Sequence, residues 1–139
     1  MAEPAPPRWS HVALNCRDLA TTEAFYRTWF GFHRARVVEL GADQIVFLRN
    51  GDAYLELFGS TAEPAQASKD DGPQQPGVPR HLAFQTDDLD AFLAAVDGAI
   101  PVQLGPLDFH DFIPGWRSAW LTDPDGVVVE ISQGYRDQE

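Results

Sequence analysis

The chain contains an internal repeat, and a repeat restricts the possible folds more than any single motif does. The first copy begins Ser10-His11-Val12-Ala13-Leu14-Asn15, and the second begins Arg80-His81-Leu82-Ala83-Phe84-Gln85. Each start leads into a segment of helical pattern. Each copy ends in an apolar stretch that contains one glutamate, Glu56 in the first copy and Glu130 in the second. The repeat therefore predicts two modules with the same plan.

The periodicity predicts the order strand, helix, strand, strand, strand in both copies. A cap at Asp18, Thr21 or Thr22 and a stop at Gly31 frame the first helix, which should end near Trp29. We expect the other elements at 9–16, 33–40, 44–49 and 53–58, and then at 81–86, 89–96 (the second helix), 102–104, 117–122 and 127–132, with an aromatic loop over 105–116. Residues 60–79 are rich in Ala, Pro, Gln, Asp and Gly and resemble a linker. The predicted organisation is a module at 9–59, a linker at 60–79 and a module at 80–133.

Strand parity places the histidine and the glutamate of each copy on the same face of that copy's sheet. Apolar neighbours flank each glutamate and therefore point to the opposite face, toward the helices. If the first strand of a copy lies beside its last, His11 becomes a neighbour of Glu56 and His81 a neighbour of Glu130. Two such sheets facing each other would bring all four side chains together. Two imidazoles and two carboxylates suit a six-coordinate divalent metal, and mixed N/O ligation fits Zn, Ni, Co, Fe(II) or Mn.

Each of these residues alone has a simpler interpretation. A histidine in a strand is usually a polar residue on the exposed face, and a glutamate between apolar neighbours usually marks the wet side of a sheet. The recurrence of all four residues in matched places favours a metal site. Further residues could line a substrate pocket, although the aromatic ones could also simply fill the space between the sheets; these residues are Asn15, Tyr54, Phe58, His110, Trp116 and Trp120.

The net charge and the cysteine content limit which kinds of partner and which cellular compartment the sequence fits. Twenty-one acidic and ten basic residues give a formal net charge of −11, which disfavours nucleic acids and anionic membranes as partners. Cys16 is the only cysteine, so an intrachain disulfide is impossible. Residues 1–8 lack the apolar segment of a secretory signal, and no apolar run approaches the roughly 20 residues that span a bilayer. We expect a cytoplasmic protein with a small-molecule partner.

The chain resembles the vicinal oxygen chelate superfamily, which includes glyoxalase I, methylmalonyl-CoA epimerase, extradiol dioxygenases, and fosfomycin and bleomycin resistance proteins. The motifs that carry this resemblance extend over about residues 11–133, and they are His11-Val12-Ala13-Leu14, Asp18-Leu19, Phe25-Tyr26, Gly31-Phe32, Tyr54-Leu55-Glu56-Leu57, His81-Leu82-Ala83-Phe84, Asp87-Asp88-Leu89 and Asp123-Pro124-Asp125-Gly126. The resemblance implies an α+β fold of two paired βαβββ modules that form a cup-shaped half-barrel. It also implies a homodimer and a divalent metal held by His11, Glu56, His81 and Glu130.

The resemblance further implies a metal-dependent lyase or isomerase of glyoxalase I type. In such an enzyme Glu130 or Glu56 would move a proton next to a carbonyl while the metal chelates the enediolate. One alternative within the same superfamily is an Fe(II) extradiol ring-cleaving dioxygenase. Another is a non-catalytic, drug-binding resistance protein. The substrate and the metal stay open at this point.

Overall fold

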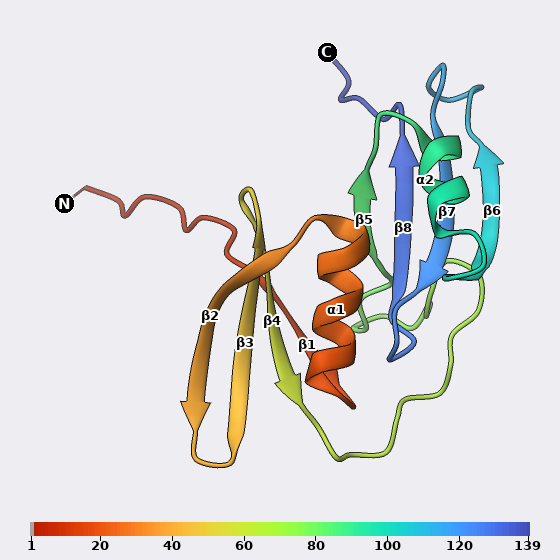
Figure 1. The fold of residues 1–139 in the computed structure, drawn as a ribbon. Coiled ribbons are helices and arrows are strands. Elements are labelled where there is room, and N and C mark those ends of the chain that lie inside the picture. The colour runs from red at the N-terminus through yellow and green to blue at the C-terminus, as the bar shows by residue number, and fades with distance from the viewer. Residues whose placement is uncertain (1) are drawn as a thin grey trace. The chain divides into compact units, whose positions relative to one another are not determined.

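The computed structural model describes residues 2–139 (Figure 1). By its contacts the chain divides into two compact units, one ending at Glu63 and the other running from Pro64 to Glu139. Within the described residues each unit contains four strands and one helix in the order β-α-β-β-β. The predicted α+β fold of two βαβββ modules is therefore confirmed. No helix within residues 2–139 combines the length and the apolar character needed to cross a membrane.

The first unit is a mixed four-stranded sheet with one helix. Its elements are β1 (Val12–Cys16), α1 (Leu19–Phe30), β2 (His33–Leu40), β3 (Asp43–Asn50) and β4 (Ala53–Gly59). The strands lie in the order β1-β4-β3-β2, with β1 parallel to β4 and the other pairs antiparallel. The first strand of the unit is thus the direct neighbour of its last strand.

The second unit repeats this topology. Its elements are β5 (Leu82–Gln85), α2 (Leu89–Val96), β6 (Val102–Asp108), β7 (Arg117–Thr122) and β8 (Val128–Gln133). The strand order is β5-β8-β7-β6, and β5 is parallel to β8. The central pair of each sheet, β4 with β3 and β8 with β7, is antiparallel. The two units therefore place corresponding residues at corresponding positions of their own sheets.

Equivalent aspartates start the two helices. The side chain of Asp18 accepts a hydrogen bond from the backbone N–H of Thr21, and the side chain of Asp88 accepts one from Ala91. Each bond satisfies a backbone donor that the first helical turn leaves free. Gly31 ends α1 in the left-handed conformation with φ of 71°, as predicted.

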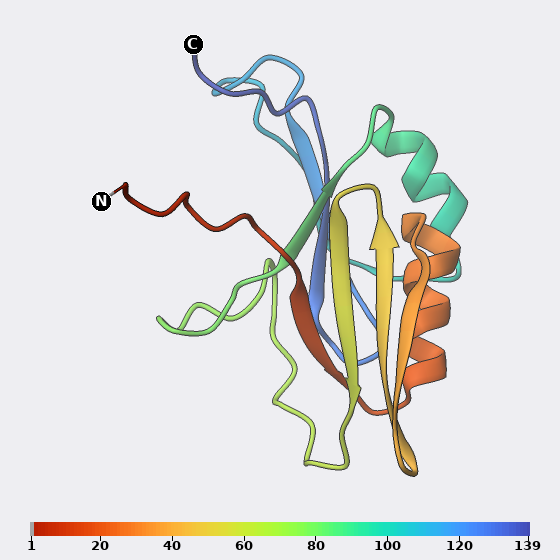
Figure 2. The ribbon, with the colours of Figure 1, turned by 90° about the vertical axis from the view of Figure 1, so that its left-hand side faces the viewer.

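Each helix covers one face of its own sheet, as Figure 2 shows for α1. In the first unit the buried Tyr26 of α1 belongs to a core that includes Leu57 of β4, and both side chains are fully buried. In the second unit Leu89 of α2 and Val129 of β8 are likewise fully buried. Burial of these apolar side chains is the main driving force for each unit. The alternate residues of β4 and β8, Glu56 and Glu130 among them, point to the sheet face opposite the helix.

Two strand boundaries differ from the prediction by more than one residue. The strand expected at 102–104 extends to Asp108, because an irregularity between Leu104 and Leu107 keeps β6 paired to β7 beyond Gly105 and Pro106. A Cβ at Gly105 would lie 2.9 Å from the Ser118 carbonyl oxygen, so glycine permits this close approach. The strand expected to begin at residue 9 begins at Val12.

Candidate metal centre

The first pair of predicted ligands, His11 and Glu56, joins the start of β1 to the middle of β4. His11 directly precedes β1, and in the parallel β1–β4 pair Ala13 lies opposite Glu56. The His11 Nε2 atom is 3.1 Å from Glu56 Oε1. The His11 side chain is 36% exposed and the Glu56 side chain 16% exposed. A small molecule can therefore reach this pair from solvent.

The second pair of predicted ligands, His81 and Glu130, has the same arrangement in its own unit. His81 directly precedes β5, and Ala83 lies opposite Glu130 in the parallel β5–β8 pair. The His81 Nε2 atom is 2.9 Å from Glu130 Oε1, and the two side chains are 21% and 14% exposed. Each predicted histidine is thus beside its glutamate, at the distance expected from the strand order.

Matching aromatic residues flank the two pairs. Phe47 of β3 lies opposite Glu56 in register, and Trp120 of β7 lies opposite Glu130. The ring of Phe47 meets the His11 ring edge-on at a centroid distance of 5.9 Å, and the ring of Trp120 meets the His81 ring at 6.4 Å. These contacts hold the imidazole rings in place.

The hydrogen bonding of His81 fits a metal ligand. Its Nδ1 atom is 2.7 Å from the backbone carbonyl oxygen of Asp71, which can only accept, so Nδ1 carries a proton. In the neutral ring the lone pair of Nε2 then faces the negative Glu130 oxygen. Either a second proton or a cation must separate these two atoms. A histidine that donates through one nitrogen to a carbonyl and presents the other nitrogen to a cation is the usual arrangement at metal sites.

His11 and the distances between the paired atoms fit a metal in the same way. The His11 Nδ1 atom is 2.7 Å from the Ser10 hydroxyl, which can accept a hydrogen bond as the Asp71 carbonyl does. Two ligands at right angles on a metal, with bonds of about 2.1 Å, are about 3.0 Å apart. The observed separations of 3.1 and 2.9 Å match that value. Residues 2–139 contain no group of three or more His, Cys, Asp or Glu side chains arranged to hold a metal, so each unit by itself offers two ligands.

The two glutamates differ in how firmly they are held. Glu130 Oε2 accepts a hydrogen bond of 2.9 Å from the hydroxyl of Ser118, which is fully buried on β7. Its other oxygen faces His81, so both oxygens are fixed. In the first unit the corresponding residue of β3 is Ile45, which cannot donate. Among the described residues, Glu56 has His11 as its polar partner. Ser118 is not among the site residues predicted from the sequence, although its parity with Trp120 points it to the Glu130 face.

The pocket candidates of the first unit separate into two places. Tyr54 and His11 line a hollow of about 790 Å³, which is further lined by Arg8, Trp9, Ser10, Phe47 and Asp52. The guanidinium of Arg49 lies 5.3 Å from the centre of the Tyr54 ring. Phe58 instead lines a different hollow beside Leu40 and Ile45. Asn15 lies opposite Phe58 in register and is exposed. The structure thus groups Tyr54, but not Asn15 or Phe58, with His11.

Of the candidates in the second unit, Trp120 lies beside His81 and is 5% exposed. Trp116 packs on Phe109 at a centroid distance of 4.8 Å and donates through Nε1 to the Ser132 hydroxyl. His110 is exposed, and its Nδ1 atom accepts a hydrogen bond from the Gly115 backbone within the same loop. Trp116 and His110 therefore have identifiable structural partners, and a substrate contact by either stays a prediction.

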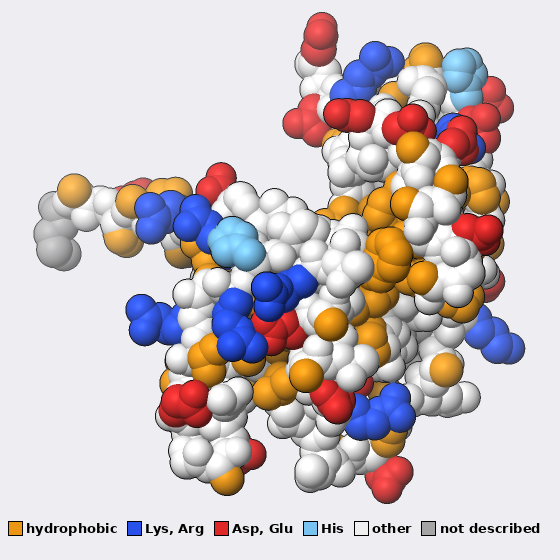
Figure 3. Space-filling model, viewed as in Figure 1, with side chains coloured by type: hydrophobic (Ala, Val, Ile, Leu, Met, Phe, Trp, Pro, Cys, Tyr) orange, Lys and Arg blue, Asp and Glu red, His pale blue; other side chains and the backbone are white. Residues whose placement is uncertain are grey.

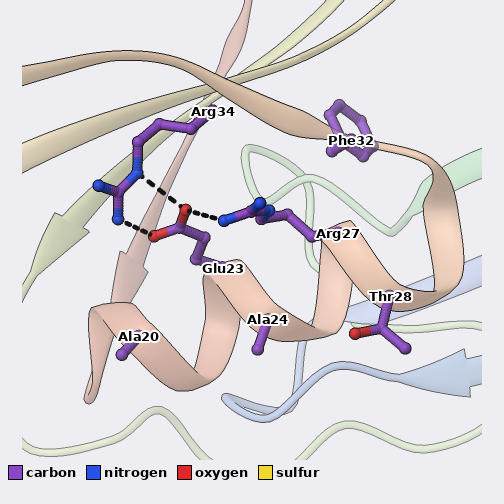
Figure 4. A pocket seen from close by; sticks show the side chains of 7 residues that line it. All are labelled: Ala20, Glu23, Ala24, Arg27, Thr28, Phe32 and Arg34. Carbon is purple, nitrogen blue, oxygen red and sulfur yellow. Dashed lines mark hydrogen bonds and ion pairs between the residues drawn. The ribbon is translucent and has the colours of Figure 1, made fainter.

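A separate charged cluster joins α1 to the start of β2 (Figure 4). Glu23, which is 5% exposed, accepts two hydrogen bonds from Arg34, of 2.9 and 2.7 Å, and one of 3.2 Å from Arg27. The hydrogen bonds from Arg34 lower the pKa of the Glu23 carboxyl, since they favour its charged form. Figure 3 shows basic side chains gathered over α1 and the strands next to it, with acidic side chains between them. Because the carboxylate is already neutralised by two arginines, the cluster stabilises the first unit rather than forming a metal site.

Comparisons with known proteins agree with this architecture. A family model described as the Glyoxalase/Bleomycin resistance protein/Dioxygenase superfamily matches residues 8–131. The uncharacterized protein YaeR of Escherichia coli (strain K12) is 29% identical over 128 residues, which cover 87% of this chain and 92% of YaeR.

Two solved structures illustrate the range of similarity. A glyoxalase family protein from Enterococcus faecalis has a TM-score of 0.70 and 29% identity, with 90% of this chain and 96% of that chain covered. A variant of the fosfomycin resistance protein FosX from Listeria monocytogenes, complexed with Mn(II) and 1S,2S-dihydroxypropylphosphonic acid, has a TM-score of 0.73 at 15% identity, with 94% and 95% covered. At that identity the likeness to FosX establishes the fold alone. The family model spans most of the chain, and the chain therefore belongs to the Glyoxalase/Bleomycin resistance protein/Dioxygenase superfamily.

Proposed function

We propose that the chain is a metal-dependent enzyme in which His11, Glu56, His81 and Glu130 hold one divalent cation. The observation that carries this proposal is the duplicated pair, an imidazole Nε2 within 3.1 Å of a carboxylate oxygen in each unit. A pair of this kind in one unit could be a simple hydrogen bond. Its recurrence at matched positions, with the His81 Nδ1 proton directed to a carbonyl, supports a role beyond packing.

The donor set leaves several metals open. Two imidazoles and two carboxylates suit Zn, Ni, Co, Fe(II) or Mn, and the Mn(II) in the FosX complex is one example from a protein of the same fold. When bound, such a cation would stabilise the negative charge that develops on a substrate oxygen. We propose that the four ligands come either from one chain or from the two chains of a homodimer. We also propose that the protein acts in the cytoplasm.

The difference between the glutamates supports different roles for them. Ser118 and His81 hold both oxygens of Glu130, which suits a fixed ligand. Glu56 is held at one oxygen, so its other oxygen can approach a substrate carbon. We therefore assign to Glu56 the removal of a proton from the carbon next to a carbonyl, and its return. A general base must come within hydrogen-bonding distance of that proton, which a carboxylate fixed at both oxygens does less easily.

The reaction class that follows is a lyase or isomerase reaction on a small α-oxygenated carbonyl compound or its thiol adduct. The hollow beside His11, lined in part by the aromatic rings of Phe47 and Tyr54, supplies apolar surface for the substrate next to Glu56. Ring cleavage by an Fe(II) dioxygenase and drug binding without turnover are the alternatives, and no further contact in the described residues favours either of them.

Solvent deuterium exchange tests this proposal. Protein loaded in turn with Zn(II), Ni(II) and Mn(II) is incubated in deuterated water with dicarbonyl–thiol adducts and acyl-CoA epimers, and deuterium at the carbon next to the carbonyl is measured by NMR. We expect exchange with at least one class, abolished in Glu56→Gln at saturating metal but retained in part in Glu130→Gln. Cleavage of a catechol by the Fe(II) form without any exchange would instead support the dioxygenase, and metal-free binding of a drug would support the binding protein.

A further inference from the structure

Trp120 carries a buried hydrogen-bond donor that has no acceptor. Its indole Nε1 is the one buried side-chain nitrogen or oxygen in residues 2–139 without a hydrogen-bond partner. The side chain is 5% exposed. Such groups are rare in folded proteins because burial removes the water that would otherwise accept the bond. An unsatisfied donor therefore calls for an explanation in terms of function.

The position of this donor connects it to the candidate metal centre. Trp120 lies opposite Glu130 in register and shares its face of β7 with Ser118, which donates to Glu130. Its ring meets the rings of His81 and Phe109 edge-on, each at a centroid distance of 6.4 Å. Aromatic rings can receive an N–H only weakly, so these contacts are a poor substitute for an oxygen acceptor. The indole is thus part of the wall around the His81–Glu130 pair.

The second tryptophan of this region provides a comparison within the same unit. Trp116 Nε1 donates to the Ser132 hydroxyl at 3.2 Å, so its N–H is satisfied by the protein itself. Ser132 lies opposite Ser118 on the neighbouring strand. The indoles of Trp116 and Trp120 thus lie at the same pair of strands, β7 and β8. Among the described residues the N–H of Trp116 has an acceptor and the N–H of Trp120 has none.

We propose that Nε1–H of Trp120 donates a hydrogen bond to an oxygen of the bound substrate, one that carries or develops negative charge. This inference rests on the proposed function, because it places the substrate beside the metal ligands. It makes Trp120 a residue that determines specificity: the site selects α-oxygenated compounds with a carboxylate or enolate oxygen, because a ligand without such an acceptor would leave the donor unsatisfied.

The test uses glycolate, a small α-hydroxy carboxylate, and protein loaded with diamagnetic Zn(II). The four indole N–H signals of 15N-tryptophan-labelled protein are recorded by NMR during a glycolate titration. We expect the Trp120 signal, identified by its absence in Trp120→Phe, to move downfield on binding. The dissociation constant of glycolate, measured at saturating Zn(II), should rise roughly tenfold in that variant, as expected for the loss of one hydrogen bond.

Two further variants control for packing. Replacement of Trp120 by benzothienylalanine exchanges the N–H for sulfur at nearly constant shape, and it should weaken glycolate binding as much as Trp120→Phe does. Trp29→Phe makes the same substitution on α1, which covers the sheet face opposite Glu56, and it should leave glycolate binding unchanged.

The outcomes separate the two proposals. An unmoved Trp120 signal at every glycolate concentration, or wild-type affinity in the benzothienylalanine variant, overturns this inference while the metal centre stands. Failure of the wild-type protein to bind Zn(II), Ni(II), Co(II), Fe(II) or Mn(II) overturns the proposed function, and the inference with it.

Discussion

Removal of the Ser118 hydroxyl should weaken metal binding without a direct change to any ligand. In Ser118→Ala, Glu130 Oε2 loses a hydrogen bond of 2.9 Å from a fully buried donor. Because the Glu130 side chain is only 14% exposed, water replaces that bond poorly. Loss of a partner that orients a metal ligand typically reduces affinity by about 10- to 100-fold, or about 1.4–2.7 kcal/mol. We expect the dissociation constant for Zn(II) to increase by that factor.

The assay is competition between the protein and a chromophoric chelator at pH 7, with urea unfolding of the metal-free protein measured in parallel. Ser132→Ala is the matched control, since Ser132 lies opposite Ser118 and is 4% exposed, yet its hydroxyl contacts Trp116 and not Glu130. It should keep wild-type Zn(II) affinity. Equal affinities of Ser118→Ala and the wild type, or an equal loss in both serine variants, would refute the role given to Ser118.

Three further substitutions test the fold and its electrostatics. Glu23→Gln should lower the free energy of unfolding by about 1–2 kcal/mol at neutral pH. Because the folded pKa of Glu23 is lowered, this contribution is present above the ordinary carboxyl range and is lost as pH falls through the folded pKa. A difference from wild type that stays constant in urea titrations as the pH is lowered through and below the ordinary carboxyl range would contradict it. Gly72→Ala should reduce both the free energy of unfolding and the Zn(II) affinity, since a Cβ at residue 72 would lie 1.8 Å from the carbonyl oxygen of Arg80, the residue before His81. Urea unfolding and the same chelator assay measure these two quantities, and wild-type Zn(II) affinity in a folded variant would count against the prediction. Leu57→Ala, at a fully buried position, should cost about 2–5 kcal/mol in chemical denaturation, and a cost below 1 kcal/mol would show that the β4 core is misassigned.

The sequence was sufficient to predict the neighbour relations that depend on strand order and parity. His11 lies beside Glu56, and His81 beside Glu130, because a first strand that joins the last strand in parallel brings these positions together. The cap of the first helix is Asp18, one of the three residues predicted for that position, and it is local because an aspartate side chain and the first helical turn are only a few residues apart. The repeat displays the strand order and the parity, and the helix cap follows from local geometry, so a single sequence is enough to predict them.

Contacts that depend on the path of an irregular segment or on the exact strand register were not predicted. The acceptor for His81 Nδ1 is the carbonyl of Asp71, which lies in the segment interpreted as a linker, and the composition of that segment gives no sign of this bond. The bond from Ser118 to Glu130 depends on the register of β7 against β8, which the hydrophobic pattern alone leaves open. The predicted length of β6 was wrong because Gly105 and Pro106 normally end a strand, whereas here β6 continues past them with an irregularity in its pairing to β7.

The central claim is that the two His–Glu pairs hold one cation, and metal stoichiometry tests it most directly. Zn(II) binding is titrated calorimetrically for the wild-type protein and for single substitutions of one ligand from each unit, Glu56→Gln and His81→Asn. We expect one high-affinity Zn(II) per chain in the wild type. The Zn(II) affinity should fall at least tenfold in each variant, since removal of a ligand from either unit leaves too few ligands. No binding by the wild type, two independent weak sites, or an unchanged affinity in either variant would contradict it.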